Sequence, residues 1–148
     1  MDGLPPASSI IEGALYQGNL LGFTAFATGT LDVHVACPAE YPPDPSGAAE
    51  VIFFPLKDDP TTNWLGKTLW CRQVLKVARK VAGDITEGKT VLVTCAAGLN
   101  RSGLVSALAL CGLGWTPNEA INAVREARPG ALFNQQFVKV IRALGPKV

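Results

Sequence analysis

Short blocks of β-branched and aromatic residues alternate along this chain with longer blocks of mixed polar and apolar residues. The short blocks predict β-strands, because their length and composition suit a buried sheet. The four strand candidates are Ile10–Tyr16, Val33–Cys37, Val51–Phe54 and Val91–Cys95. Helices are expected between these strands and after the last of them.

Two of the longer blocks predict helices of different character. In Trp64–Ala82, four apolar residues recur at spacings of four, three and four, which makes one buried stripe. These residues are Trp70, Val74, Val77 and Val81. The segment from Arg101 or Ser102 to Cys111 is almost wholly apolar, so its helix is expected to be buried centrally against the sheet.

Capping signals mark two further helices. Thr116-Pro117-Asn118-Glu119 combines an N-cap threonine, a proline at the first helical position and a glutamate at the third. A helix should therefore start there and stop before Pro129. The last helix is expected from Asn134 to Leu144, closed by the glycine and proline that follow.

The alternation of strands and helices predicts an α/β architecture with one central sheet. The 148 residues, 48% hydrophobic and 17% charged, fit a single domain over 1–148 with a sizeable core. Residues 38–49 contain four prolines, a glycine and a serine, and are expected to form a surface loop within this domain.

Charge and cysteine usage argue against several classes of function. Thirteen basic and twelve acidic residues leave a formal charge of +1, so there is no strong nucleic-acid or membrane-surface signal. No apolar run approaches the ~20 residues of a membrane span, and the N-terminus lacks signal-peptide regions, so a cytoplasmic protein is expected. The four cysteines are scattered without a Cys-x-x-Cys pair, which indicates neither a disulfide framework nor a zinc site.

One segment carries candidate chemistry: Cys95-Ala96-Ala97-Gly98-Leu99-Asn100-Arg101-Ser102-Gly103, between an expected strand and an expected helix. In that layout the loop N–H groups can turn around an anion at the helix N-terminus. The same field and the Arg101 cation would stabilise a thiolate at Cys95, and a guanidinium can hold two phosphoryl oxygens at once. We therefore expect a phosphate or other oxyanion to be bound by Ala96, Ala97, Gly98, Leu99, Asn100 and Arg101.

This loop resembles the signature loop of the cysteine-dependent protein tyrosine phosphatase superfamily, and in particular the small dual-specificity type. Residues 11–18 resemble the family's opening strand, 54–60 its general-acid loop, and 127–134 the stretch after the loop helix. The resemblance implies a mixed sheet of about four to five strands with helices on both faces. It also implies metal-independent, cofactor-free hydrolysis of phosphotyrosine and/or phosphoserine and phosphothreonine in a protein substrate.

The resemblance also implies roles for single residues. Cys95 would be the nucleophile that forms a cysteinyl phosphate, while Arg101 and the loop amides hold the phosphoryl oxygens. Asp58 aligns with the general acid, and the adjacent Asp59 is the alternative. Ser102 would donate a hydrogen bond to the sulfur leaving group. Asn134 would cap its helix or brace the loop.

At one position the chain departs from the family, because Thr94 stands where a histidine normally precedes the nucleophile. Since that histidine helps to order the loop, a catalytically weak phosphate-binding module is one alternative. Residues 98–103 also resemble the loop of RNA 5′-phosphatases and triphosphatases of the same cysteine-dependent type, which is a second alternative. His34, the single histidine of the chain, lies in an expected strand and is interpreted as a strand residue.

A second motif competes with the cysteine loop. Gly83-Asp84-Ile85-Thr86-Glu87-Gly88-Lys89-Thr90 matches the Walker A pattern letter for letter. That pattern cradles phosphates when a strand enters the loop and a helix leaves it. Here an expected helix precedes the match and an expected strand follows it. The segment is therefore interpreted as a polar connection between the two.

Overall fold

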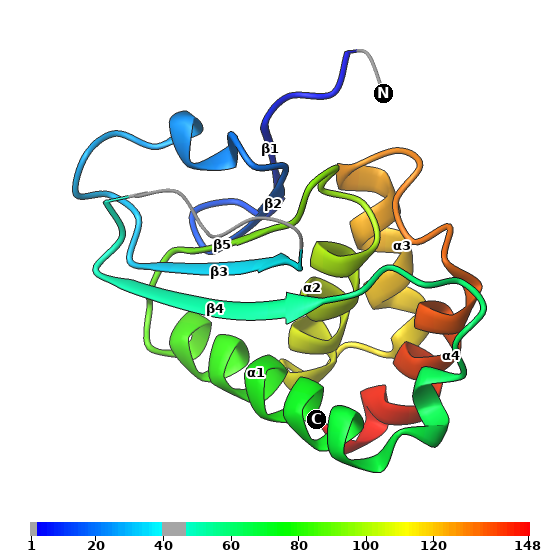
Figure 1. The fold of residues 1–148 in the computed structure, drawn as a ribbon. Helices are drawn as coiled ribbons and strands as arrows, with labels where there is room; N and C mark the ends of the chain where they lie inside the picture. The colour runs from blue at the N-terminus through cyan, green and yellow to red at the C-terminus, as the bar shows by residue number, and fades with distance from the viewer. Residues whose placement is uncertain (1–2, 40–46) are drawn as a thin grey trace.

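The computed structural model describes residues 3–39 and 47–148, and five strands of this part form one mixed sheet (Figure 1). The strands are β1 Ala7–Ile11, β2 Leu15–Gly18, β3 Val33–Pro38, β4 Glu50–Leu56 and β5 Val91–Thr94. Their order across the sheet is β1-β2-β5-β3-β4; β1 is antiparallel to β2, and the other neighbours are parallel. The expected α/β fold with one mixed sheet is confirmed. Residues 40–46 of the expected surface loop lie outside the described residues.

The prediction of one strand over Ile10–Tyr16 was wrong. The chain instead forms a tight hairpin, in which β1 and β2 pair on either side of residues 12–14. Gly13 has φ +79°, a left-handed conformation that glycine adopts at little cost, and Ala14 N–H donates to the Ile11 carbonyl at 2.9 Å. The apolar residues on both sides of Glu12 and Gly13 concealed this turn.

Four α-helices follow: α1 Thr68–Thr86, α2 Arg101–Gly112, α3 Pro117–Ala127 and α4 Gln135–Leu144. The helix expected over Trp64–Ala82 is divided, because a short 3-10 helix, η2 (Trp64–Gly66), precedes α1. Lys67 is extended there, and its N–H closes the η2 turn on the Trp64 carbonyl at 3.0 Å. The expected capping box of α3 is present, with Thr116 and Glu119 each accepting from the other's backbone N–H.

The helices cover the two faces of the sheet unequally. The four α-helices gather on one side of the sheet (Figure 1). Val91 and Val93 of β5 belong to the same hydrophobic core as the buried residues of α2. On the opposite face the 3-10 helix η1 (Gly22–Ala25) packs near Leu92 and Thr94 of β5. Every residue of α2 from Arg101 to Cys111 is buried, which confirms its expected central position.

The Walker-like segment connects α1 to β5, in the order expected. Its first four residues are the last four of α1. No further helix lies between them and the start of β5 at Val91. Lys89 forms ion pairs with Asp84 at 3.6 Å and with Glu87 at 3.5 Å. Within residues 3–39 and 47–148, no helix combines the length and apolar character that crossing a membrane requires.

Candidate active site

Cys95 lies directly after β5, at the point where the chain turns towards the N-terminus of α2. Its side chain is 2% exposed, and its Sγ atom lies 3.2 Å from the Ser102 hydroxyl oxygen in the first turn of α2. The Cys95 N–H donates to the Gly18 carbonyl of β2 at 3.2 Å. Sheet and helix therefore hold the thiol and the hydroxyl together.

The loop 96–100 passes through a left-handed turn at Gly98, with φ +70°. A Cβ atom at this position would lie 2.6 Å from the Gly18 carbonyl carbon, so a side chain would displace the loop from β2. The Gly98 carbonyl accepts from Gln17 Nε2 at 3.0 Å and from Arg128 Nε at 2.8 Å. The Leu99 carbonyl accepts from the Leu132 N–H at 3.3 Å. These carbonyl oxygens are occupied by donors from outside the loop.

Arg128, directly after α3, is the most extensive brace of this loop. It is 1% exposed and donates to the carbonyls of Gly98, Ala97 and Pro5 and to the Ser8 hydroxyl. Burial lowers the pKa of the guanidinium, and nearby Cys95 opposes that shift. Sequence reasoning assigned no role to Arg128 or Gln17. The stretch 127–134 resembled the family, but no residue pattern showed which of its side chains would turn back to the loop.

Arg101 begins α2 and is 6% exposed. Its NH1 group donates to the Leu56 carbonyl at 3.2 Å, at the end of β4. Leu56 directly precedes the segment that contains Asp58, so the arginine contacts the chain that presents this carboxyl group. The first helical N–H groups of α2 and the Arg101 guanidinium thus lie at the same end of the sheet as Cys95.

Both carboxylate oxygens of Asp58 accept hydrogen bonds from asparagine side chains. Asn100 Nδ2 donates to Oδ2 at 2.9 Å, and Asn134 Nδ2 donates to Oδ1 at 2.7 Å. The Asn134 N–H in turn donates to Asn100 Oδ1 at 3.0 Å. Asn134 also caps α4, so the two roles that the sequence left open for it are combined.

Asp59 faces its own turn instead. Its carboxylate accepts from the Thr61 N–H and hydroxyl at 2.8 and 2.7 Å, and from the Thr62 hydroxyl at 2.6 Å. These hydrogen bonds, led by that of Thr62, lower the pKa of Asp59 to about 2. Asp58 and Asp59 therefore have separate partners: the first contacts the cysteine loop, and the second stabilises the turn that follows.

Thr94, the departure from the family pattern, has a histidine partner. His34 Nε2 on β3 lies 2.8 Å from the Thr94 hydroxyl oxygen on β5. His34 is 3% exposed, and burial lowers its pKa to about 4, so the ring is neutral at pH 7. The interpretation of His34 as a strand residue holds for its backbone. No local pattern indicated that its side chain would meet the residue before Cys95.

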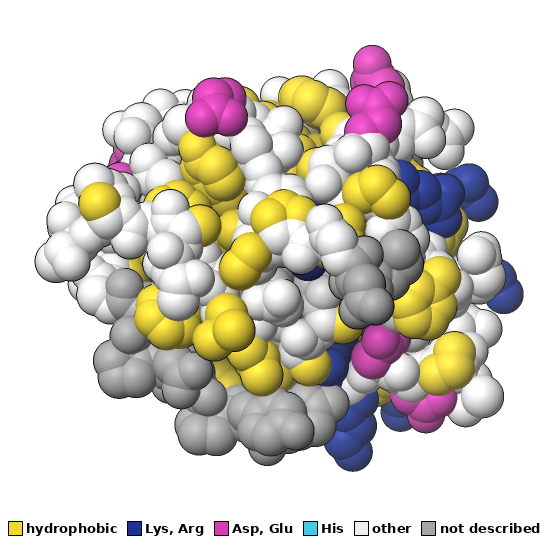
Figure 2. Space-filling model, turned by 90° about the horizontal axis from the view of Figure 1, so that it is seen from above, with side chains coloured by type: hydrophobic (Ala, Val, Ile, Leu, Met, Phe, Trp, Pro, Cys, Tyr) yellow, Lys and Arg dark blue, Asp and Glu magenta, His cyan; other side chains and the backbone are white. Residues whose placement is uncertain are grey.

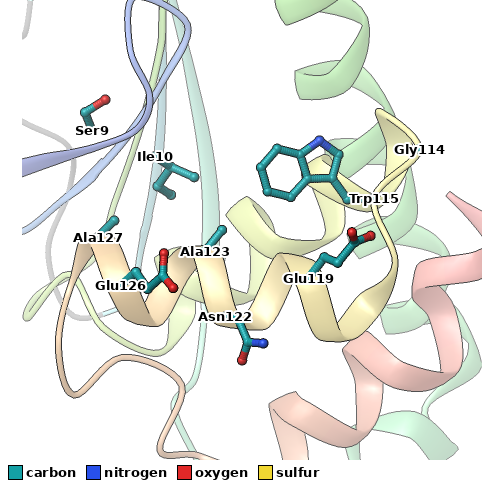
Figure 3. A pocket seen from close by; sticks show the side chains of 9 residues that line it. All are labelled: Ser9, Ile10, Gly114, Trp115, Glu119, Asn122, Ala123, Glu126 and Ala127. Atoms are coloured by element: carbon teal, nitrogen blue, oxygen red, sulfur yellow. The ribbon is translucent and has the colours of Figure 1, made fainter.

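A hollow of the described surface lies away from the cysteine loop. It has a volume of about 810 Å³ between β1 and α3, and none of its lining residues belongs to 95–101. Figure 3 shows Trp115 and Glu119 at one end of this hollow and Glu126 at the other. Seen from above the sheet, hydrophobic and uncharged side chains occupy the centre of the surface, and Lys and Arg gather towards one side (Figure 2).

Comparisons with known proteins agree with this geometry. Residues 32–146 match the family model described as "Dual specificity phosphatase, catalytic domain". The chain is 26% identical to Tk-PTP in its active form, with a TM-score of 0.74, and the match covers 97% of this chain and 99% of that one. It is 22% identical to human DUSP28, with a TM-score of 0.77 and coverage of 97% and 95%. A search of curated proteins finds no match.

A third similar structure is named phosphatase-like and not phosphatase. It is the human tyrosine phosphatase-like serine/threonine/tyrosine-interacting protein, which is 20% identical with a TM-score of 0.70. The match covers 93% of each chain. This fold therefore occurs both in proteins named phosphatases and in one named phosphatase-like. The functional argument has to rest on the site residues, because the fold alone does not decide it.

Proposed function

Because this chain belongs to the dual-specificity phosphatase catalytic-domain family, we propose that it hydrolyses phosphotyrosine and/or phosphoserine and phosphothreonine in proteins through a cysteinyl-phosphate intermediate. It is a cysteine-dependent dual-specificity phosphatase. The observation that carries the mechanism is the pair formed by Cys95 Sγ and the Ser102 hydroxyl, 3.2 Å apart at the N-terminus of α2. A buried thiol at a helix N-terminus, near a buried arginine, is suited to nucleophilic attack on a phosphate ester.

In the first step, the Cys95 thiolate attacks the phosphorus atom and the bond from phosphorus to the ester oxygen breaks. Asp58 gives a proton to the departing oxygen, which leaves as an alcohol or phenol. Arg101 and the loop N–H groups bind the phosphoryl oxygens. The loop is suited to this because donors outside it occupy the carbonyls of Gly98 and Leu99, which leaves N–H groups to face an anion.

In the second step, water attacks the phosphorus atom and gives a proton to Asp58. The sulfur–phosphorus bond breaks, inorganic phosphate forms and the thiolate is restored. Ser102 supports this step, because its hydroxyl is close enough to donate a hydrogen bond to the departing sulfur. Each proton and bond is accounted for by Cys95, Asp58 and water, so no metal or cofactor enters the proposed reaction.

The two alternatives stay predictions. The hydrogen-bonded pair of His34 and Thr94 weakens the argument for a weak phosphate-binding module, because a histidine side chain does support the residue before the nucleophile. An RNA substrate would favour a strongly basic surface, whereas the chain has a formal charge of +1. A protein substrate and a cytoplasmic location remain the preferred proposals.

The mechanism is tested with an aryl phosphate in buffer that contains EDTA. We expect wild-type turnover to be unaffected by EDTA, and Cys95→Ser to abolish it while orthovanadate or phosphate still binds, since Arg101 and the loop are unchanged. Rapid acid quench should trap a phosphorylated protein in wild type and not in Cys95→Ser. Wild-type activity in the serine variant would exclude the covalent mechanism.

A further inference from the structure

Two asparagine side chains meet at Asp58, and backbone groups determine which way each amide points. Asn100 Oδ1 accepts from the Asn134 N–H, and Asn134 Oδ1 accepts from the N–H groups of Gln136 and Phe137. A backbone N–H can only donate, so both amide oxygens are assigned and both NH2 groups must face Asp58. The carboxyl group is therefore held by two donors whose orientation the surrounding backbone imposes.

The segment that carries Asp58 is anchored on its other side as well. The Asp59 carbonyl accepts from Trp64 Nε1 at 3.0 Å, and the Asp59 carboxylate accepts from Thr61 and Thr62. Trp64 stacks on Trp70, with ring centroids 4.9 Å apart, and lies 6.3 Å from Phe137 of α4. The N-terminal turn of α4 thus supports the segment through Asn134 and through Phe137.

We propose that Asn100 and Asn134 are positioning residues that hold the carboxyl group of Asp58 against the cysteine loop before substrate binds. This rests on the proposed role of Asp58 as general acid. A carboxyl group offers about four lone-pair positions, and the two amides use one on each oxygen. The remaining positions can carry the proton that passes to the leaving oxygen. A group already within reach of the loop need not be brought there during each turnover.

The test compares two aryl phosphates, because a general acid matters most when the leaving group is poor. Phenyl phosphate releases a weakly acidic phenol, whereas 4-nitrophenyl phosphate releases a much more acidic one. The quantity measured is kcat/KM, which includes proton transfer to the first leaving group. We expect Asp58→Ala to lower kcat/KM by about 10²–10⁴-fold on phenyl phosphate and by much less on 4-nitrophenyl phosphate.

Asn100→Ala should show the same selectivity at smaller size, with a loss of about 10–10²-fold on phenyl phosphate and a minor loss on 4-nitrophenyl phosphate. Asn134→Ser should behave likewise, because serine keeps an N-cap oxygen for α4 and removes the amide donor. In the double variant Asn100→Ala with Asp58→Ala, the asparagine change should cause no further loss, since the group that it positions is gone.

Asp59→Ala is the matched control, because this neighbour bonds within its own turn and not to the asparagines. It should affect both substrates equally. Equal losses on both substrates in Asn100→Ala, or losses that multiply in the double variant, would overturn the positioning role. A selective loss in Asp59→Ala would reassign the acid and overturn it too. Failure of the proposed function is distinguishable from failure of the positioning role. In that case the hydrolysis of the aryl phosphates by wild type would persist in Cys95→Ser.

Discussion

His34 and Thr94 form a buried polar contact between two central strands, next to Cys95. The imidazole Nε2 reaches the Thr94 hydroxyl, while Nδ1 is buried without a hydrogen-bond partner among the described residues. Placing a charge on such a ring is costly, and this is why burial lowers the pKa of His34 to about 4 from 6.5. The His34 ring is therefore neutral in the folded protein at neutral pH.

This shift predicts a pH dependence of stability. Between pH 6.5 and about 4 the unfolded chain binds a proton at His34 and the folded chain does not, so the free energy of unfolding should fall as the pH falls. The loss across this window is about 3 kcal/mol. His34→Gln keeps a polar side chain without titration in this range. Urea unfolding at a series of pH values should show the difference between the two proteins shrinking as the pH is lowered; parallel curves would contradict the prediction.

At the scale of elements, the cysteine loop depends on contacts from two distant segments, one of which is itself held by a third. Gln17 of β2 and Arg128 after α3 bind the same carbonyl, that of Gly98, and Arg128 also binds Pro5 and Ser8 at the start of the chain. The loop geometry is therefore imposed from outside and does not follow from residues 95–101 alone.

Arg128→Met tests this dependence. Because the carbonyls of Pro5 and Ala97 would lose a charged donor, we expect a loss of about 2–3 kcal/mol in the free energy of unfolding and weaker binding of orthovanadate. Arg142→Met on the exposed face of α4 is the control, and it should change neither quantity appreciably. Calorimetry and vanadate titration measure the two effects. Vanadate affinity equal to that of wild type in a folded Arg128→Met protein would show that the brace is dispensable.

At the scale of the whole molecule, the site draws on most of the chain. Gln17, Asp58, Cys95 and Asn134 come from segments spread along the sequence, and one continuous core joins sheet and helices. A site of this kind exists only when the whole domain is folded, so ligand binding and global unfolding should be linked.

Orthovanadate should therefore stabilise the entire domain in one step. At 100 times its dissociation constant, the expected gain is about 2.7 kcal/mol, with a single transition by fluorescence and by circular dichroism. Arg101→Lys should lose most of this gain, because an ammonium group cannot make the two-pronged contact. Two separate transitions, or a full gain in the lysine variant, would argue against a single cooperative unit built around this site.

Much of the architecture could be predicted from local signals in the sequence. Helix α3 is encoded by its capping box, which needs only Thr116, Pro117 and Glu119. The order of strand, loop and helix around Cys95, though not the geometry of the loop, is likewise encoded by the apolar run before Cys95, by Gly98 and by the apolar run after Arg101. Such features were predictable because every group involved lies within a few residues of the others.

Only the tertiary structure decided which distant side chains complete the site. His34 and Thr94 are 60 residues apart, Gln17 and Gly98 are 81 apart, and Asp58 and Asn134 are 76 apart. The contact of Asp58 rather than Asp59 with the cysteine loop depends on how β4, α2 and α4 converge, since both aspartates suit the local pattern. A single sequence shows the periodicity of its hydrophobic residues and the residues that are typical of turns and helix caps. The pairing of distant polar groups instead follows from the order of the strands and the packing of the helices.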